Sequence, residues 1–130
     1  MRTMLIVDDD EAWRGLYTAE FKRQFRLVEA TDGLEALNAL ERTKPDIIVL
    51  DLRLPRLNGL DFLRALERQG VKTPVVVCSG LVEDDDSFPI PGVRTAPKTA
   101  DLREIRAAVE QALGQPPAPT APCRPRPDRR

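Results

Sequence analysis

The sequence predicts an α/β protein in which a parallel sheet carries helices on both faces, and three observations support this fold class. Short apolar runs without polar alternation occur at residues 4–7, 47–50 and 75–78, as is typical of strands buried on both faces. Segments with the apolar spacing of amphipathic helices lie between these runs. Strands that alternate with helices pair in parallel, because each helix returns the chain to the same end of the sheet.

The remaining elements follow in chain order. Mixed or alternating patterns predict two further strands, at residues 26–30 and 93–96. Apolar residues that recur on one face predict three helices, with Trp13, Leu16, Tyr17 and Phe21 in the first (about 11–24), Leu34, Leu37 and Leu40 in the second, and Leu60, Leu63 and Leu66 in the third. A last helix is expected to begin after Asp101 as its N-cap and to carry Leu102, Ile105, Val109 and Leu113.

The order of the strands follows from their polarity. The strands at 26–30 and 93–96 are less apolar than the other three, so we expect them at the sheet edges. The order 2-1-3-4-5 satisfies this condition and is the order of the flavodoxin-like doubly wound fold. In such folds ligands bind outside the carboxyl ends of the strands, where the strand order reverses. Asp8 and Asp9 follow the first strand and Asp51 ends the third, so their carboxylates should converge at that point.

The segments around these aspartates resemble a known family. The stretch KPDIIVLDLRLPRLNG at residues 44–59 is similar to the phosphorylation-site signature of response regulator receiver domains of two-component signal transduction, the CheY-like superfamily. The stretch LIVDDD at residues 5–10 resembles the acidic metal-binding opening of that family. The resemblance extends from about residue 1 to 113 and implies one receiver domain there, followed by a tail at 114–130.

The resemblance implies a role for each acidic residue. Asp51 would be the phosphoacceptor, because a carboxylate can attack phosphorus and form an acyl phosphate. Mg²⁺ would be the cofactor, with Asp9 as its main carboxylate and Asp8 holding it through water. The carboxylate of Asp51 and the backbone carbonyl of Arg53 would supply further ligands. The resemblance also implies signalling through protein contacts rather than an enzyme with its own substrate.

Two further residues are assigned by the resemblance. Lys98 would pair with Asp51 and later with the phosphoryl group, although Thr99 follows it where the family usually has Pro. Ser79 would be the hydroxyl that responds to the phosphoryl group. The segment 81–92 departs from the family, because its two prolines interrupt the fourth helix expected there. We therefore expect a shortened or absent fourth helix.

Two alternative functions were weighed. A haloacid-dehalogenase-type phosphatase would use Asp8 as nucleophile and Asp10 as acid or base, but that family expects Thr or Val where this chain has Ala12, and Asp51 would have no role. We expect Asp10 to cap the first helix instead. A receiver-like scaffold that works without phosphorylation is the other alternative. The intact set of Asp8, Asp9, Asp51, Ser79 and Lys98 argues against it.

Composition limits the partners. The chain of 130 residues has no His, so any phosphohistidine must come from a histidine kinase or a histidine phosphotransfer protein. A net charge of −1 and the lack of a basic stripe argue against direct nucleic-acid binding. No apolar stretch is long enough for a membrane span, and two cysteines that are poor disulfide candidates suit a cytoplasmic location. The tail at 114–130 is rich in Pro and Arg and is expected to be disordered.

Overall fold

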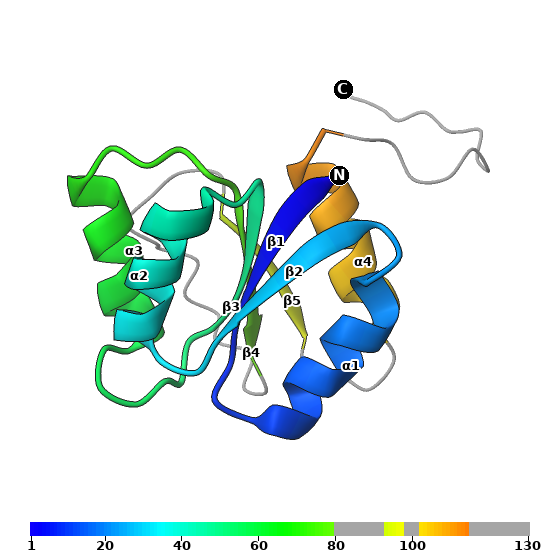
Figure 1. The fold of residues 1–130 in the computed structure, drawn as a ribbon, viewed down its shortest axis with the longest axis horizontal. Coiled ribbons are helices and arrows are strands. Elements are labelled where there is room, and N and C mark those ends of the chain that lie inside the picture. Colours follow the sequence, from blue (N-terminus) through cyan, green and yellow to red (C-terminus); the bar gives the residue numbers. More distant parts are fainter. Residues whose placement is uncertain (80–92, 98–101, 115–130) are drawn as a thin grey trace.

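The computed structural model describes residues 1–79, 93–97 and 102–114 of the chain. These residues form a sheet of five strands with four helices (Figure 1). The elements in chain order are β1 (Arg2–Val7), α1 (Glu11–Phe21), β2 (Phe25–Ala30), α2 (Gly33–Thr43), β3 (Ile47–Asp51), α3 (Gly59–Arg68), β4 (Val75–Ser79), β5 (Arg94–Pro97) and α4 (Arg103–Ala112).

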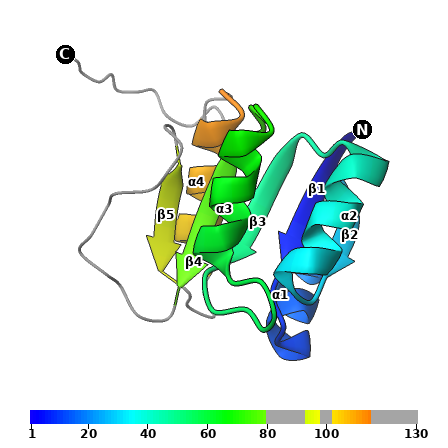
Figure 2. The same ribbon diagram turned by 90° about the vertical axis from the view of Figure 1, so that its left-hand side faces the viewer.

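The sheet topology confirms the predicted fold class. All four strand pairs are parallel, and the order is β2-β1-β3-β4-β5, with β2 and β5 at the edges. Helices α1 and α4 cover one face of the sheet, and α2 and α3 cover the other (Figures 1 and 2). The helix labelled α4 is the last of the predicted helices, and residues 81–92, where a shortened fourth helix was expected, lie outside the described residues.

Two apolar layers hold the helices against the sheet. In β1, Met4 and Ile6 pack with α1 and α4, whereas Leu5 and Val7 pack with α2 and α3. Successive side chains of a strand point to opposite faces, so a run without polar alternation can contribute to both layers. This accounts for the apolar runs seen in the sequence, because each central strand is buried from above and below.

The predicted helix faces are partly wrong. Leu16, Leu34 and Leu60 were expected in the core, but each is exposed, by 39%, 47% and 37%. In α2 the sheet is contacted by Ala36 and Ala39, whose small side chains let the helix backbone approach the strands closely. Leu37 packs against the core and Leu40 is buried, so the alanines share the buried face of α2 with these two leucines, and Leu34 lies outside it.

The ends of two helices also differ from the prediction. Helix α1 ends at Phe21 rather than near residue 24. The N-cap of α4 is Leu102, which makes no side-chain capping hydrogen bond, and Asp101 lies outside the described residues. Among the described helices, none has the length and apolar character that crossing a membrane requires.

Candidate functional site

Three carboxylates meet at the carboxyl ends of β1 and β3. Asp8, Asp9 and Asp51 each offer an oxygen, and these three oxygens all lie within 4.8 Å of one another. Asp8 and Asp51 are buried, whereas Asp9 is exposed. We call these three residues the acidic cluster. It lies where the strand order reverses, as the sequence predicted, because β1 and β3 are neighbours in the sheet but are separated in the chain by β2.

Strand register explains which way the cluster faces. Val7 is in register with Leu50, so the next residues, Asp8 and Asp51, are side by side. Asp51 is itself in register with Cys78. Neighbouring residues in register point to the same face of a parallel sheet, and this row follows the parity of the residues that pack under α1 and α4. The acidic cluster therefore lies at the carboxyl end of the sheet and faces the side that α1 covers.

A buried phenol lies beneath this row. Tyr17 of α1 is 1% exposed and packs against the same face of the sheet. Burial raises the pKa of Tyr17 well above its ordinary value, and the neighbouring Cys78, Asp8 and Asp51 raise it further. The phenol therefore stays protonated across the ordinary pH range, and it adds no negative charge below the carboxylates.

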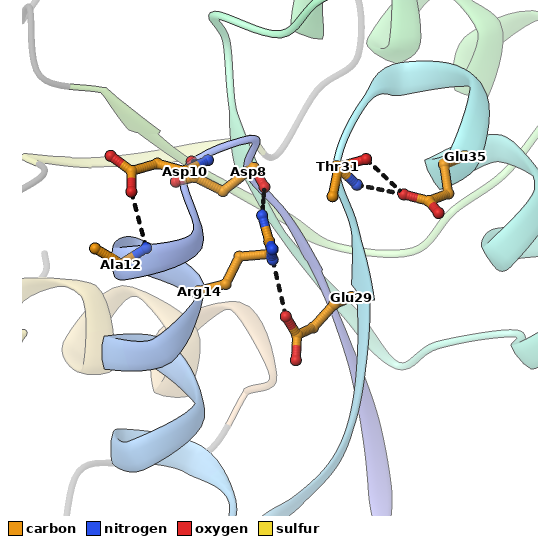
Figure 3. Close-up of polar contacts among 7 residues, drawn as sticks. All are labelled: Asp8, Asp10, Ala12, Arg14, Glu29, Thr31 and Glu35. Carbon is orange, nitrogen blue, oxygen red and sulfur yellow. Dashed lines mark hydrogen bonds and ion pairs between the residues drawn. The ribbon is translucent and has the colours of Figure 1, made fainter.

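The backbone around Asp8 is fixed on several sides. The Asp8 amide donates to the carbonyl of Ala30 at the end of β2, over 3.1 Å. The amide of Asp10 donates to Asp8 Oδ1 over 2.9 Å. The carboxylate of Asp10 in turn accepts from the amide of Ala12 over 2.8 Å, so Asp10 is the N-cap of α1, as predicted (Figure 3). One oxygen of Asp10 is thus engaged in capping α1, which is the role that the sequence favoured over that of a phosphatase acid.

Arg14 links the same loop to the sheet edge. Its Nη1 donates to the backbone carbonyl of Asp8 over 2.9 Å, and its Nε donates to Glu29 Oε1 over 2.8 Å (Figure 3). Glu29 is in register with Ile6, which packs under α1. The Glu29 side chain therefore points to the face of the sheet that α1 covers, where Arg14 lies. Figure 3 also shows Thr31, whose amide and hydroxyl donate to the carboxylate of Glu35 at the start of α2.

The loop after β3 is packed closely against the strand end. The amide of Arg53 donates to Asp51 Oδ1 over 3.1 Å. The carboxylate is thus oriented by the backbone two residues further along the chain. The amide of Gly59 donates to the carbonyl of Leu52 over 3.0 Å. A Cβ at Gly59 would lie 2.6 Å from the Cα of Leu52, so this glycine is required by close approach. The turn pair of Asn58 and Gly59 thus returns the chain directly into α3, with Asn58 as its N-cap.

A second ion pair ties this loop to α2. Arg56 donates through Nε and Nη2 to Asp32 Oδ2, over 3.1 and 2.7 Å. Asp32 is the N-cap of α2, and its Oδ1 accepts from the amide of Glu35. The hydrogen bond from Glu35 is the main cause that lowers the pKa of Asp32, and burial opposes it while Arg56 adds to it.

The structure brings together some of the predicted site residues and leaves others outside. Asp8, Asp9 and Asp51 form one cluster. Arg53 lies in the loop beside it, through its amide contact with Asp51. Ser79 ends β4, in register with Pro97, but its side chain lies outside the description. Lys98 is outside the described residues altogether.

We did not predict from the sequence the contacts of Arg14 with Asp8 and Glu29, or that of Arg56 with Asp32. Arg14 stands six residues after Asp8 in the first turns of a helix, which is close enough in sequence to fold back on the loop. Glu29, however, reaches Arg14 only because β2 pairs with β1 at a particular register. The contact of Arg14 with Asp8 could therefore be expected from sequence proximity, whereas its contact with Glu29 depends on how the strands pair.

Comparisons with known proteins define the family. The model of the response regulator receiver domain matches residues 4–110. The chain therefore belongs to the response regulator receiver family, which agrees with its parallel sheet and acidic cluster.

Two curated relatives indicate the range of proteins that contain such a domain. The chain is 41% identical over 91 residues to a protein-glutamate methylesterase/protein-glutamine glutaminase of Treponema denticola, covering 62% of this chain and 23% of that protein. It is 34% identical over 116 residues to the response regulator MprA of Mycobacterium leprae, covering 85% of this chain and 50% of that protein. The chain thus spans at most half the length of these relatives.

Solved structures share the fold. The receiver domain of the Francisella response regulator 1452 superposes with a TM-score of 0.70 at 27% identity, covering 84% of this chain and 95% of that one. The response regulator TrrA of Thermotoga maritima, solved in complex with Mg²⁺–BeF, has a TM-score of 0.78 at 20% identity and covers 87% of this chain and 100% of that one. At 20% identity the second similarity establishes the fold alone.

Proposed function

We propose that this chain is a phosphoacceptor receiver of a two-component phosphorelay. In this proposal Asp51 accepts a phosphoryl group from a histidine kinase or a histidine phosphotransfer protein, and the phosphorylated chain signals through protein contacts. The observation that carries the proposal is the acidic cluster at the strand-order reversal of a receiver domain. Its buried members, Asp8 and Asp51, lie at the carboxyl ends of two neighbouring interior strands.

The acidic cluster fits a magnesium ion. Mg²⁺ binds oxygen ligands at about 2.0–2.1 Å in an octahedron, so opposite ligands lie roughly 4 Å apart. Three carboxylate oxygens within 4.8 Å of one another can surround one such ion directly or through a water. We assign Asp9 as the main ligand, Asp8 as a ligand through water and the Arg53 carbonyl as a further ligand. An ion bound there would neutralise charge on the phosphoryl oxygens.

The chemistry of Asp51 follows from its position. Its Oδ1 accepts a hydrogen bond from the Arg53 amide. We propose that a carboxylate oxygen of Asp51 attacks phosphorus. A new O–P bond forms at Asp51 while the N–P bond of the donor phosphohistidine breaks, and the electron pair of that bond returns to the imidazole. By the same proposal Lys98 pairs with the phosphoryl charge and the Ser79 hydroxyl donates to one of its oxygens.

The proposal includes a domain division and a location. The receiver domain would comprise residues 1–113, which contain the family match at 4–110, and residues 114–130 would be a separate tail. We propose no enzymatic activity for this chain beyond its own phosphorylation and dephosphorylation; the methylesterase relative is matched over 23% of its length. A cytoplasmic location would suit a kinase partner and the buried Cys78, which is a thiol and not part of a disulfide.

A scaffold without phosphorylation is the alternative, and a chemical trap distinguishes the two. The chain is exposed to a small phosphoramidate donor with Mg²⁺ and then to borohydride, which reduces an acyl phosphate to an alcohol. Peptide mapping should find homoserine in place of Asp51 and aspartate unchanged at Asp61, an exposed carboxylate on α3. Unreduced Asp51 after full exposure would favour the scaffold.

A further inference from the structure

The acidic cluster needs something to hold its loop in place. Three carboxylates within 4.8 Å of one another repel, and the two buried ones are screened less by solvent than exposed groups are. Asp8 and Asp9 also lie in a short connection between β1 and α1. Left to repulsion alone, this connection would move outward and separate the ligand oxygens before any ion arrived.

The contact that opposes this movement comes from Arg14. Its guanidinium binds the backbone carbonyl of Asp8 and, through a different nitrogen, the carboxylate of Glu29. The Arg14 side chain is 15% exposed and the Glu29 side chain 47% exposed, so the contact with the Asp8 carbonyl is better shielded from water than the ion pair with Glu29. Charge-assisted hydrogen bonds of this kind are stronger than neutral ones, and the planar guanidinium fixes the direction of both.

The groups that accept hydrogen bonds from Arg14 show whether it holds the backbone of the loop or binds the carboxylate oxygens themselves. Arg14 donates to a main-chain carbonyl and to Glu29, not to the carboxylate oxygens of the acidic cluster. Asp8 Oδ1 accepts instead from the Asp10 amide. Arg14 thus fixes the backbone that carries the ligands and does not occupy the ligand oxygens themselves, while Glu29 balances its charge.

We propose that Arg14, held by Glu29, is a positioning residue that presets the Asp8–Asp9 loop for a divalent cation. This inference rests on the proposed function, because it assigns regulation of the affinity of the same site. Edge strand β2 becomes part of the site by this route, through Glu29 and through the Ala30 carbonyl that receives the Asp8 amide. Loss of partners that orient metal ligands typically costs 10–100-fold in affinity.

The sign of one substitution separates positioning from simple charge. Arg14 is a cation near an anionic site, so if only its charge mattered, Arg14→Gln would strengthen Mg²⁺ binding. If it positions the loop, Arg14→Gln weakens Mg²⁺ binding, by about tenfold at the low end of that range. Arg14→Lys keeps the charge but lacks the two-pronged fork, so it should also weaken binding.

The experiment measures Mg²⁺ dissociation constants by titration calorimetry for wild type, Arg14→Gln, Arg14→Lys and Glu29→Gln. Arg64→Gln is the matched control, because it removes the same charge from an exposed ion pair with Asp61 on α3. Amide hydrogen exchange of Asp10 in metal-free protein is the second readout, since that amide donates to Asp8 Oδ1. We expect weaker Mg²⁺ binding and faster exchange of the Asp10 amide in the two Arg14 variants and in Glu29→Gln. Arg64→Gln should show neither change.

The outcomes are distinguishable. Wild-type binding with equal or tighter binding by Arg14→Gln and unchanged Asp10 exchange would overturn this inference and leave the proposed function standing. A wild type that binds no Mg²⁺ would overturn both. If Arg14→Gln does not fold, Arg14→Lys and Glu29→Gln decide the matter by the same two readouts. A purely structural role would lower the thermal midpoint of these variants without changing the Mg²⁺ affinity of the folded protein, and that result would also overturn it.

Discussion

Arg56 donates two hydrogen bonds to a single oxygen of Asp32, and this pair joins the loop after β3 to the start of α2. Asp32 is nearly buried, with 8% of its side chain exposed, while 64% of the Arg56 side chain is exposed. Next to this pair, a Cβ at Gly33 would lie 2.1 Å from the carbonyl oxygen of Leu57. The two loops are therefore in direct contact as well as ion-paired.

The first prediction concerns pH. The folded state lowers the pKa of Asp32, so its ionised form contributes stability above its ordinary pKa of 3.8, and that contribution is lost as the pH falls through the lowered value. Asp32→Asn keeps a good N-cap but loses the ion pair. At pH 7 it should be less stable than wild type, by up to about 1 kcal/mol because Arg56 is exposed.

Urea unfolding at pH 7 and near pH 2.5 checks this prediction. The difference between wild type and Asp32→Asn should shrink at the lower pH, because protonation removes the charge of Asp32 as the pH falls through its lowered pKa. A difference that stays constant between the two values would show that the carboxylate charge of Asp32 is not what stabilises the loop.

The second prediction concerns the close contact of the two loops. Gly33→Ala should lower the free energy of unfolding by about 1–3 kcal/mol, because the new methyl group meets the backbone of Leu57. Gly15→Ala is the matched control: it lies in α1 with nothing within 4 Å of the new Cβ, and it should stabilise by about 0.5–1 kcal/mol. Urea denaturation compares them, and equal effects of the two substitutions would refute the packing assigned to Gly33.

The third prediction separates two adjacent aspartates. Asp9→Ala should weaken Mg²⁺ binding and, as a consequence, phosphorylation, while the fold is retained because Asp9 is exposed. Asp10→Ala should instead lower the free energy of unfolding by about 1 kcal/mol through the lost N-cap, with Mg²⁺ affinity little changed. Calorimetric Mg²⁺ titration and urea unfolding measure both. An Asp9→Ala protein with wild-type Mg²⁺ affinity would exclude Asp9 as a ligand.

The fourth prediction tests the domain division. Removal of residues 114–130 should change the free energy of unfolding by no more than about half a kcal/mol, as expected for changes away from packed surfaces. Thermal or urea unfolding of the truncated and full chains makes the comparison. A marked loss of stability would mean that the receiver domain includes part of the tail.

Strand order and site location could be predicted from the sequence because they depend on patterns that a strand carries by itself. The runs at 47–50 and 75–78 reveal central strands, and the mixed pattern at 26–30 reveals an edge. Once the order is known, Asp8 and Asp51 must meet, since they end neighbouring parallel strands. The N-cap role of Asp10 is equally local, and it was predicted for that reason.

The helix faces and the arginine links could not be predicted in the same way. Leu34 is exposed because α2 packs through Ala36 and Ala39, and apolar spacing ranks large side chains above small ones that allow close approach. The pairs of Arg14 with Glu29 and of Arg56 with Asp32 depend on strand register and loop contact. An arginine side chain is long enough to reach many acceptors, so the sequence does not indicate which one it binds.

The most direct test of the whole account is the intact mass of the chain after exposure to a small-molecule phospho-donor, with and without Mg²⁺. Wild type and Asp61→Asn, an exposed control on α3, should gain one phosphoryl mass only when Mg²⁺ is present. Asp51→Asn should gain none, because the amide cannot form the acyl phosphate. Labelling of Asp51→Asn at the wild-type level would contradict the assignment of Asp51 as the phosphoacceptor.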